Sequence, residues 1–157
     1  MIHTFIVNGK SIHVDCNPGD LLADVLRQAG YVEVKKACGT GNCGLCTVLL
    51  DSVPVPSCSV LAGKADGKSV TTIRGVSAEA QELAAYLVAE GVDQCGYCSP
   101  GFALMVIAMR RELADPSEDE IRRYLSGNLC RCSGYQGHMR AILKYLKEHP
   151  AGEANHG

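Results

Sequence analysis

Short runs of alternating apolar and polar positions, rich in β-branched residues, dominate the first part of the chain. Residues 4–7 (TFIV) and 11–14 (SIHV) are two short β-rich runs around Asn8-Gly9, a turn signal that predicts a β-hairpin. Asp20 is expected to cap a helix whose apolar positions recur at helical spacing and which ends before Gly30. Residues 47–50 and 69–73 are predicted to be further strands.

The periodicity changes to helical in the second part of the chain. Pro100 suits the first turn of a helix, and the pairs Ser117/Glu120 and Ser133/Gln136 have the spacing of capping boxes. Helices are therefore predicted over residues 78–90, 100–113, 117–125 and 133–147. The predicted fold class is α+β. A plant-ferredoxin-like β-grasp domain (residues 1–75) precedes a four-helix bundle (76–148) and a flexible tail (149–157).

Composition narrows the classes of function. The 157 residues carry a net charge of −2 without a basic block, and only 5% are aromatic, which argues against nucleic-acid binding. The first twenty residues lack the pattern of a signal peptide, and no apolar run could cross a membrane, so a cytoplasmic location is expected. In a reducing compartment, nine cysteines indicate metal binding rather than disulfides.

Eight of the nine cysteines form two groups of four. The first group has the C-x4-C-x2-C spacing of plant-type 2Fe-2S ferredoxins, followed by a distant fourth cysteine: Cys38, Cys43, Cys46 and Cys58. Gly39, Gly41 and Gly44 would permit the positive φ angles of a tight loop and let backbone N–H groups face the cluster. A structural zinc site is the alternative, although such sites usually pair two C-x2-C knuckles.

The second group consists of a C-x2-C and a C-x-C pair: Cys95, Cys98, Cys130 and Cys132. Each pair lies just before a predicted helix, so two positive helix N-termini would face one anionic cluster. Spacing alone also suits zinc here. A Rieske centre is not favoured, because no histidine is interleaved with either group. Cys16 lies outside both groups and is expected to be a small buried residue, whereas the five histidines are expected at the surface or in the tail.

The stretches CGTGNCGLCTVLLD, QCGYCSPGF and GNLCRCSGY together resemble the small 2Fe-2S subunits of the xanthine dehydrogenase, or molybdenum hydroxylase, family. The resemblance covers residues 2 to 147. It implies a large partner subunit with molybdopterin and a medium subunit with FAD, assembled as a dimer of heterotrimers. Within such a complex the chain would relay single electrons and have no substrate site or catalytic residue of its own.

The resemblance also assigns roles to residues. Cys95, Cys98, Cys130 and Cys132 would bind the cluster proximal to the pterin, and the first group the distal cluster near FAD. Gln94 and Cys132 match residues that contact the pterin. A free-standing two-cluster ferredoxin is the alternative function, although this near-balanced composition lacks the charged docking face of a soluble carrier. A structural zinc module is a third.

Overall fold

The computed structural model describes residues 1–151 and places the expected sheet at the N-terminus. Five strands form one sheet in the order β2-β1-β5-β3-β4, in which only β1 and β5 are parallel. Their bounds are Ile2–Val7 (β1), Lys10–Asp15 (β2), Thr47–Leu50 (β3), Val53–Pro56 (β4) and Ser69–Thr71 (β5). Helix α1 (Leu22–Gln28) buries its apolar side against this sheet, and α2 (Ala62–Ala65) is a single turn.

Two hairpin turns set the register of the sheet. Asn8 and Gly9 both have positive φ (51° and 79°), as a type I′ turn requires, and the predicted hairpin is confirmed. Asp51 and Ser52 form a second such turn between β3 and β4. Strand β4, which contains two prolines, was not predicted. They are tolerated because β4 is an edge strand of the sheet.

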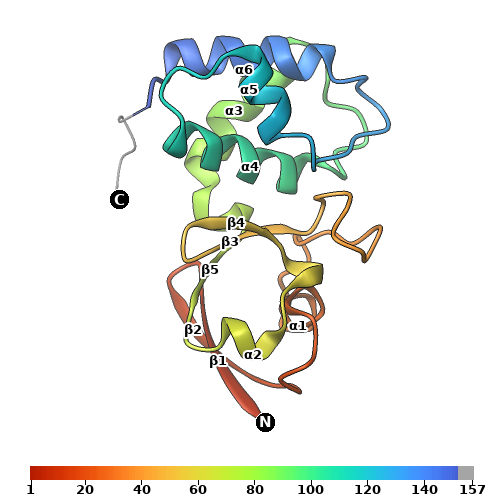
Figure 1. Ribbon diagram of the computed structural model, residues 1–157, viewed down its shortest axis with the longest axis vertical. Helices are drawn as coiled ribbons and strands as arrows, with labels where there is room; N and C mark the ends of the chain where they lie inside the picture. Colours follow the sequence, from red (N-terminus) through yellow and green to blue (C-terminus); the bar gives the residue numbers. More distant parts are fainter. Residues whose placement is uncertain (152–157) are drawn as a thin grey trace.

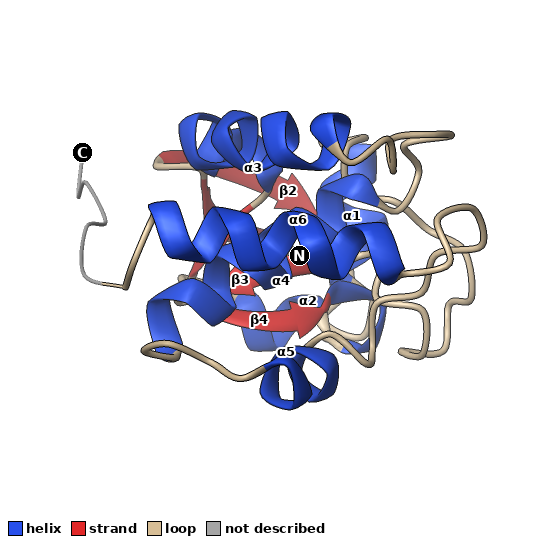
Figure 2. Ribbon diagram, turned by 90° about the horizontal axis from the view of Figure 1, so that it is seen from above, coloured by secondary structure: helices blue, strands red, loops and turns tan. Residues whose placement is uncertain are grey.

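Four helices follow within residues 1–151 and build the second layer of the molecule (Figure 1). Their bounds are Ser77–Ala89 (α3), Ser99–Glu112 (α4), Glu118–Tyr124 (α5) and Gln136–Glu148 (α6). Seen from above, α3 and α5 lie on opposite sides of α6 (Figure 2). The α+β class and the order of the two parts are confirmed. Of the predicted tail, residues 152–157 lie outside the described residues.

Helix ends differ from the expected caps in two of three cases. The box at Ser117 and Glu120 is present and starts α5. The Asp20 cap is wrong: Leu21 is the N-cap of α1, and the Asp20 carboxylate instead accepts from the Asn17 N–H (2.9 Å). The Ser133/Gln136 box is also wrong, because α6 begins only at Gln136.

Helix α4 joins the bundle to the sheet. In Figure 1 it lies between the other helices and β3, and its inner side shares an apolar core with the sheet. Leu49 of β3 is 1% exposed and packs in this core with Leu104 and Ile107 of α4. A separate core fills the bundle between α3, α4, α5 and α6. The start of α4 is therefore fixed relative to the sheet by packing.

An ion-pair clamp holds α3 against α6. Glu90 ends α3, and its side chain accepts hydrogen bonds from Lys144 and from Arg140 Nε (2.8 Å), both on α6. These two cations, Lys144 first, hold the pKa of the Glu90 carboxyl below its ordinary value.

We predict that Glu90→Gln lowers the free energy of unfolding near neutral pH. The folded-state pKa is depressed, so this stabilisation is present above the ordinary carboxyl pKa of about 4.3 and is lost as pH falls through the folded pKa. Urea unfolding of the wild type and of Glu90→Gln should give free energies of unfolding that differ near pH 7 and converge in acid. Glu118→Gln, in an exposed pair with Arg122, is the control with little expected effect. Equal behaviour of the two variants would contradict the clamp.

Candidate metal centres

The first group of cysteines lies on the loop before β3 and on a short 3-10 turn, Ser57–Ser59. Cys38 is exposed, whereas Cys43, Cys46 and Cys58 are buried. The N–H groups of Thr40 (3.4 Å) and Cys43 (3.3 Å) donate to the Cys38 sulfur. The Cys58 N–H donates to the Cys46 sulfur (3.4 Å). These hydrogen bonds join the four residues as two pairs, Cys38 with Cys43 and Cys46 with Cys58.

Backbone donors already favour a thiolate at the exposed end of this loop. The N–H groups of Thr40 and Cys43 lower the pKa of Cys38 to about 5. Burial has the opposite effect on Cys46 and raises its pKa to about 11. Gly39, Gly41 and Gly44 all have positive φ, as expected for the loop. At Gly44 the requirement is also steric, because a Cβ there would lie 2.3 Å from the Gly127 carbonyl oxygen.

The second group brings together two loops that are distant in sequence. Cys95 and Cys98 lie just before α4, and Cys130 and Cys132 lie between α5 and α6. The sulfurs of Cys95 and Cys132 are 3.6 Å apart at the surface. Cys98 and Cys130 are the partly buried members of the group, and burial first and Cys130 second raise the pKa of Cys98 to about 12. These thiols also form two pairs, one outer and one inner.

Only one of the two helix N-termini lies directly at this group. Cys98 is the N-cap of α4, which begins at Ser99, one residue before the start expected at Pro100. Helix α6 begins four residues after Cys132, because Tyr135 takes a left-handed conformation (φ 69°) before it. Ser133 forms hydrogen bonds within the loop and does not cap α6. Its N–H donates to the Cys130 sulfur (3.4 Å), and its hydroxyl accepts from the Tyr135 N–H (3.2 Å).

The arrangement of the cysteines in pairs fits a two-iron cluster better than a single metal ion. In residues 1–151, no three His, Cys, Asp or Glu side chains are grouped as ligands of one metal ion. A four-cysteine zinc site needs all four thiolates on one ion, whereas a 2Fe-2S cluster takes two on each iron. Both groups supply two pairs, so the residues present fit 2Fe-2S clusters.

The two residues expected to contact the pterin lie together at the surface. The Gln94 side chain donates from Nε2 to the Cys132 carbonyl oxygen (3.2 Å). Cys95 and Cys132 are both exposed beside them. Three large side chains surround this face and are close to half exposed: Tyr97, Leu129 and Tyr135. The arrangement resembles an uncovered interface with an apolar rim.

Sequence reasoning missed the residues that join the two cysteine loops. The Leu129 N–H donates to the Cys43 carbonyl (2.8 Å), and Asn128 Nδ2 donates to the Gly44 carbonyl (3.2 Å). Tyr97 donates its hydroxyl proton to the Lys36 carbonyl (2.8 Å). Asn128 is 6% exposed. Asn128, Leu129 and Tyr97 lie inside the cysteine motifs, but no local pattern shows which distant carbonyl each one reaches.

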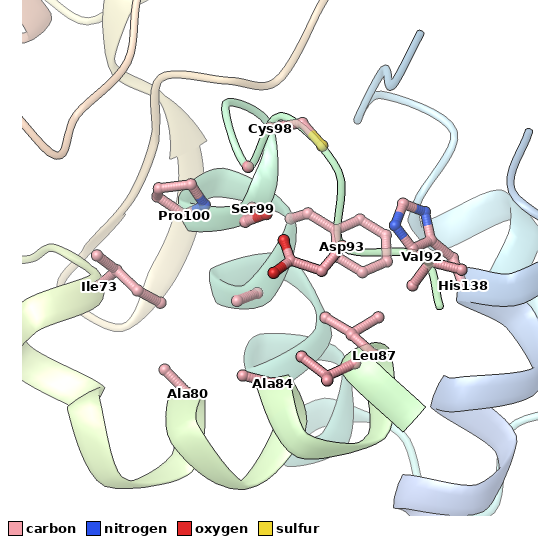
Figure 3. A pocket seen from close by; sticks show the side chains of 14 residues that line it. Ile73, Ala80, Ala84, Leu87, Val92, Asp93, Cys98, Ser99, Pro100 and His138 are labelled. Atoms are coloured by element: carbon pink, nitrogen blue, oxygen red, sulfur yellow. The ribbon is translucent and has the colours of Figure 1, made fainter. Parts of the chain in front are cut away.

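The expectation that the histidines lie at the surface or in the tail is wrong for His3 and His138. Both are buried, and His138 stacks on Phe102 with ring centroids 4.4 Å apart. Its Nδ1 lies 3.2 Å from the Ser133 hydroxyl. His138 also lines a cavity of about 270 Å³ between α3, α4 and the loop before Cys98 (Figure 3). His156 lies outside the described residues. Cys16 is buried, as expected.

Comparison with known proteins assigns both groups to described domains. Residues 5–72 match the 2Fe-2S iron-sulfur cluster binding domain, and residues 72–143 match the [2Fe-2S] binding domain. The xanthine dehydrogenase iron-sulfur-binding subunit of Escherichia coli is 39% identical, over 87% of this chain and 89% of the relative. The chain belongs to the small 2Fe-2S subunits of the xanthine dehydrogenase family.

Further relatives agree with this family. The nicotinate dehydrogenase small FeS subunit of Eubacterium barkeri is 38% identical, over 90% of this chain and 92% of the relative. The crystal structure of the aldehyde oxidoreductase from Desulfovibrio desulfuricans ATCC 27774 superposes with a TM-score of 0.86 at 35% identity. This chain, 94% of which is aligned, spans only 17% of that longer polypeptide. Both matched domain descriptions name a 2Fe-2S cluster, which decides against the zinc alternative.

Within residues 1–151, no helix combines the length and apolar character that crossing a bilayer requires.

We predict that Gly101→Ala destabilises the protein and loosens the contact between the two cysteine loops. A Cβ at Gly101 would lie 2.5 Å from the Gly44 carbonyl oxygen and 3.0 Å from that of Leu45, so the backbone must shift. Overpacking of this kind costs about 1–3 kcal/mol. Denaturant unfolding of the cluster-loaded protein should show it. Gly19→Ala, at a turn with open space, is the control. Equal midpoints for both variants would contradict the close approach.

Proposed function

We propose that this chain is the electron-transfer subunit of a multisubunit molybdenum hydroxylase. Its iron–sulfur relatives are named as subunits of xanthine and nicotinate dehydrogenases, which supports this role. The proposed ligands of the distal cluster are Cys38, Cys43, Cys46 and Cys58. Those of the proximal cluster are Cys95, Cys98, Cys130 and Cys132. When bound, each cluster accepts and releases one electron at a time.

The outer pair of the second group carries the proposal. Cys95 and Cys132 have exposed sulfurs 3.6 Å apart, while their inner partners are partly buried. An exposed ligand pair with an apolar rim suits a permanent partner that covers it. A free-standing ferredoxin would leave Tyr97, Leu129 and Tyr135 in water, so the observed face supports a subunit rather than a carrier.

This chain's own residues then have defined tasks toward the partners. Gln94 and Cys132 are proposed to contact the molybdopterin of the large subunit, since they form one hydrogen-bonded unit on the exposed face. Cys38, exposed at the other loop, is proposed to lie nearest the FAD of a medium subunit. The expected assembly is a dimer of such heterotrimers in the cytoplasm. Residues 1–75 and 76–148 are proposed as the two cluster domains.

Inside the chain, backbone donors compensate the negative charge of the thiolates. The N–H groups of Thr40 and Cys43 point at Cys38, and the Ser133 N–H points at Cys130. Helix α4 adds the positive end of its dipole directly after Cys98. Such donors stabilise the extra electron of a reduced cluster, which is the property a relay needs.

We predict that Cys132→Ser removes or alters the proximal cluster signal and spares the distal one. Cys132 lies more than seventy residues from the first group in sequence, and none of its described contacts reaches that loop. Iron should fall from about four to about two atoms per chain. EPR of the dithionite-reduced complex, with iron and sulfide analysis, is the measurement. In the complex, reoxidation of molybdenum should also slow.

Cys16→Ser is the matched control, because Cys16 is the ninth cysteine and lies outside both motifs; it is buried in the same core as Cys46 and Cys58, and its hydrogen bonds go to Met1. It should keep both signals and the full iron content. Two unaltered signals in Cys132→Ser would overturn the ligand assignment. A wild-type protein that purifies with both clusters and without a molybdenum-bearing partner would instead support the ferredoxin alternative.

A further inference from the structure

A tyrosine in a strained backbone conformation closes the loop that follows Cys132. Tyr135 has φ 69° and ψ −24°, in the left-handed region that a bulky side chain rarely adopts. Gly134 before it has φ 67°, so the chain makes a left-handed turn of two residues before α6 begins. Contacts that only this conformation makes must offset the strain at Tyr135.

The phenol of Tyr135 returns to the second group of cysteines. Its hydroxyl oxygen accepts from the Cys130 N–H at 2.8 Å, five residues back along the chain. The Tyr135 N–H donates to the Ser133 hydroxyl (3.2 Å), and the Tyr135 ring meets the edge of His138 with ring centroids 6.4 Å apart. The phenol is therefore held in place against the backbone of a proposed cluster ligand.

This contact takes one hydrogen-bond donor away from the surroundings of the proposed cluster. The Ser133 N–H donates to the Cys130 sulfur (3.4 Å), whereas the N–H of Cys130 itself donates to the phenol. In the first group, by contrast, the N–H groups of Thr40 and Cys43 both donate to a cysteine sulfur. Tyr135 thus occupies an N–H group that would otherwise be free to face the second group.

Two effects of the phenol act in the same direction on a reduction potential at this site. N–H groups that face cluster sulfurs stabilise the extra electron of the reduced state, so withholding one of them lowers the potential. The phenol oxygen also turns the negative end of its dipole towards the Cys130 backbone, which disfavours added negative charge there. A lower potential means that an electron is held less tightly and is passed on more readily.

We infer that Tyr135 is a positioning residue that directs the Cys130 N–H away from the cluster of the second group and so lowers the reduction potential of that cluster. The inference rests on the proposed function and its ligand assignment. Tyr135 keeps its proton throughout, and no bond to it forms or breaks.

The decisive variant is Tyr135→Phe, which removes the acceptor oxygen and keeps the ring. Tyr97→Phe is the matched control, because both phenols are 45% exposed on the same face, but the hydroxyl of Tyr97 donates to the Lys36 carbonyl. The full chain, purified with both clusters, is titrated with dithionite in the presence of redox mediators while the two EPR signals are followed. Cys132→Ser identifies which signal belongs to the second group.

Tyr135→Phe is expected to raise the midpoint potential of the second-group signal. At the wild-type midpoint, the ratio of its reduced to its oxidised form should therefore rise several-fold. The first-group signal should titrate as in the wild type, and Tyr97→Phe should leave the second-group midpoint unchanged. An unchanged or lower second-group midpoint in Tyr135→Phe, or an equal shift in Tyr97→Phe, overturns the inference and leaves the proposed function intact. A wild-type chain without two cluster signals overturns the proposed function itself.

A smaller chemical change decides the matter if Tyr135→Phe does not assemble both clusters. 3-Fluorotyrosine incorporated in place of Tyr135 alone keeps the ring and the hydroxyl, but fluorine withdraws charge from the oxygen and weakens it as an acceptor. At a slightly acidic pH, where this phenol keeps its proton, the second-group midpoint should rise, and that of the first group should stay the same. A second-group midpoint equal to that of the wild type would overturn the inference.

Discussion

Close contact between the backbone of α4 and the first cysteine loop is the constraint on which the rest of the molecule depends. Only a glycine fits at position 101, because the carbonyl oxygens of Gly44 and Leu45 occupy the space of any Cβ. The shared core of Leu49, Leu104 and Ile107 then extends this contact away from the loop. Since Cys98 directly precedes α4, packing fixes its position relative to Cys43, independently of the linker between the two parts.

The packed loops also supply the hydrogen-bond donors that stabilise negative charge on the thiolates. Two groups of four thiolates at close quarters would repel each other if each depended on solvent alone. Here each group has its own donors: the Thr40 and Cys43 N–H groups for one, the Ser133 N–H and the start of α4 for the other. Because these donors are backbone groups in packed loops, they need no reorganisation when the charge changes.

The sequence predicts features that depend on local chemistry. Cysteine spacing identifies both groups, the Asn8-Gly9 turn predicts the first hairpin, and Ser117 with Glu120 predicts the start of α5. Expectations fail where distant contacts override local preference. Strand β4 contains Pro54 and Pro56 and exists only because it lies at the edge of the sheet.

Tertiary contacts also explain why Ser133 does not cap α6 and why the hydrogen bonds between the two cysteine loops were not predicted. Ser133 has a capping sequence, yet its groups are engaged by Cys130 and Tyr135, so the helix starts later. The carbonyl that Asn128 reaches belongs to Gly44, 84 residues away, and no single-sequence pattern contains that pairing. The two groups of cysteines were therefore visible in the sequence, but the contacts that relate one group to the other were not.

The thiols of the proposed relay differ in exposure, with some at the surface and others covered by the chain. Cys38 is exposed in the first group, and Cys95 and Cys132 are exposed in the second, whereas Cys43 is buried and Cys130 is partly buried. The exposed sulfurs are the ones available to partner subunits, and the covered residues are those joined through Leu129. Under the proposed ligand assignment, an electron that enters beside Cys132 moves towards the side of the chain where the two cysteine loops contact each other.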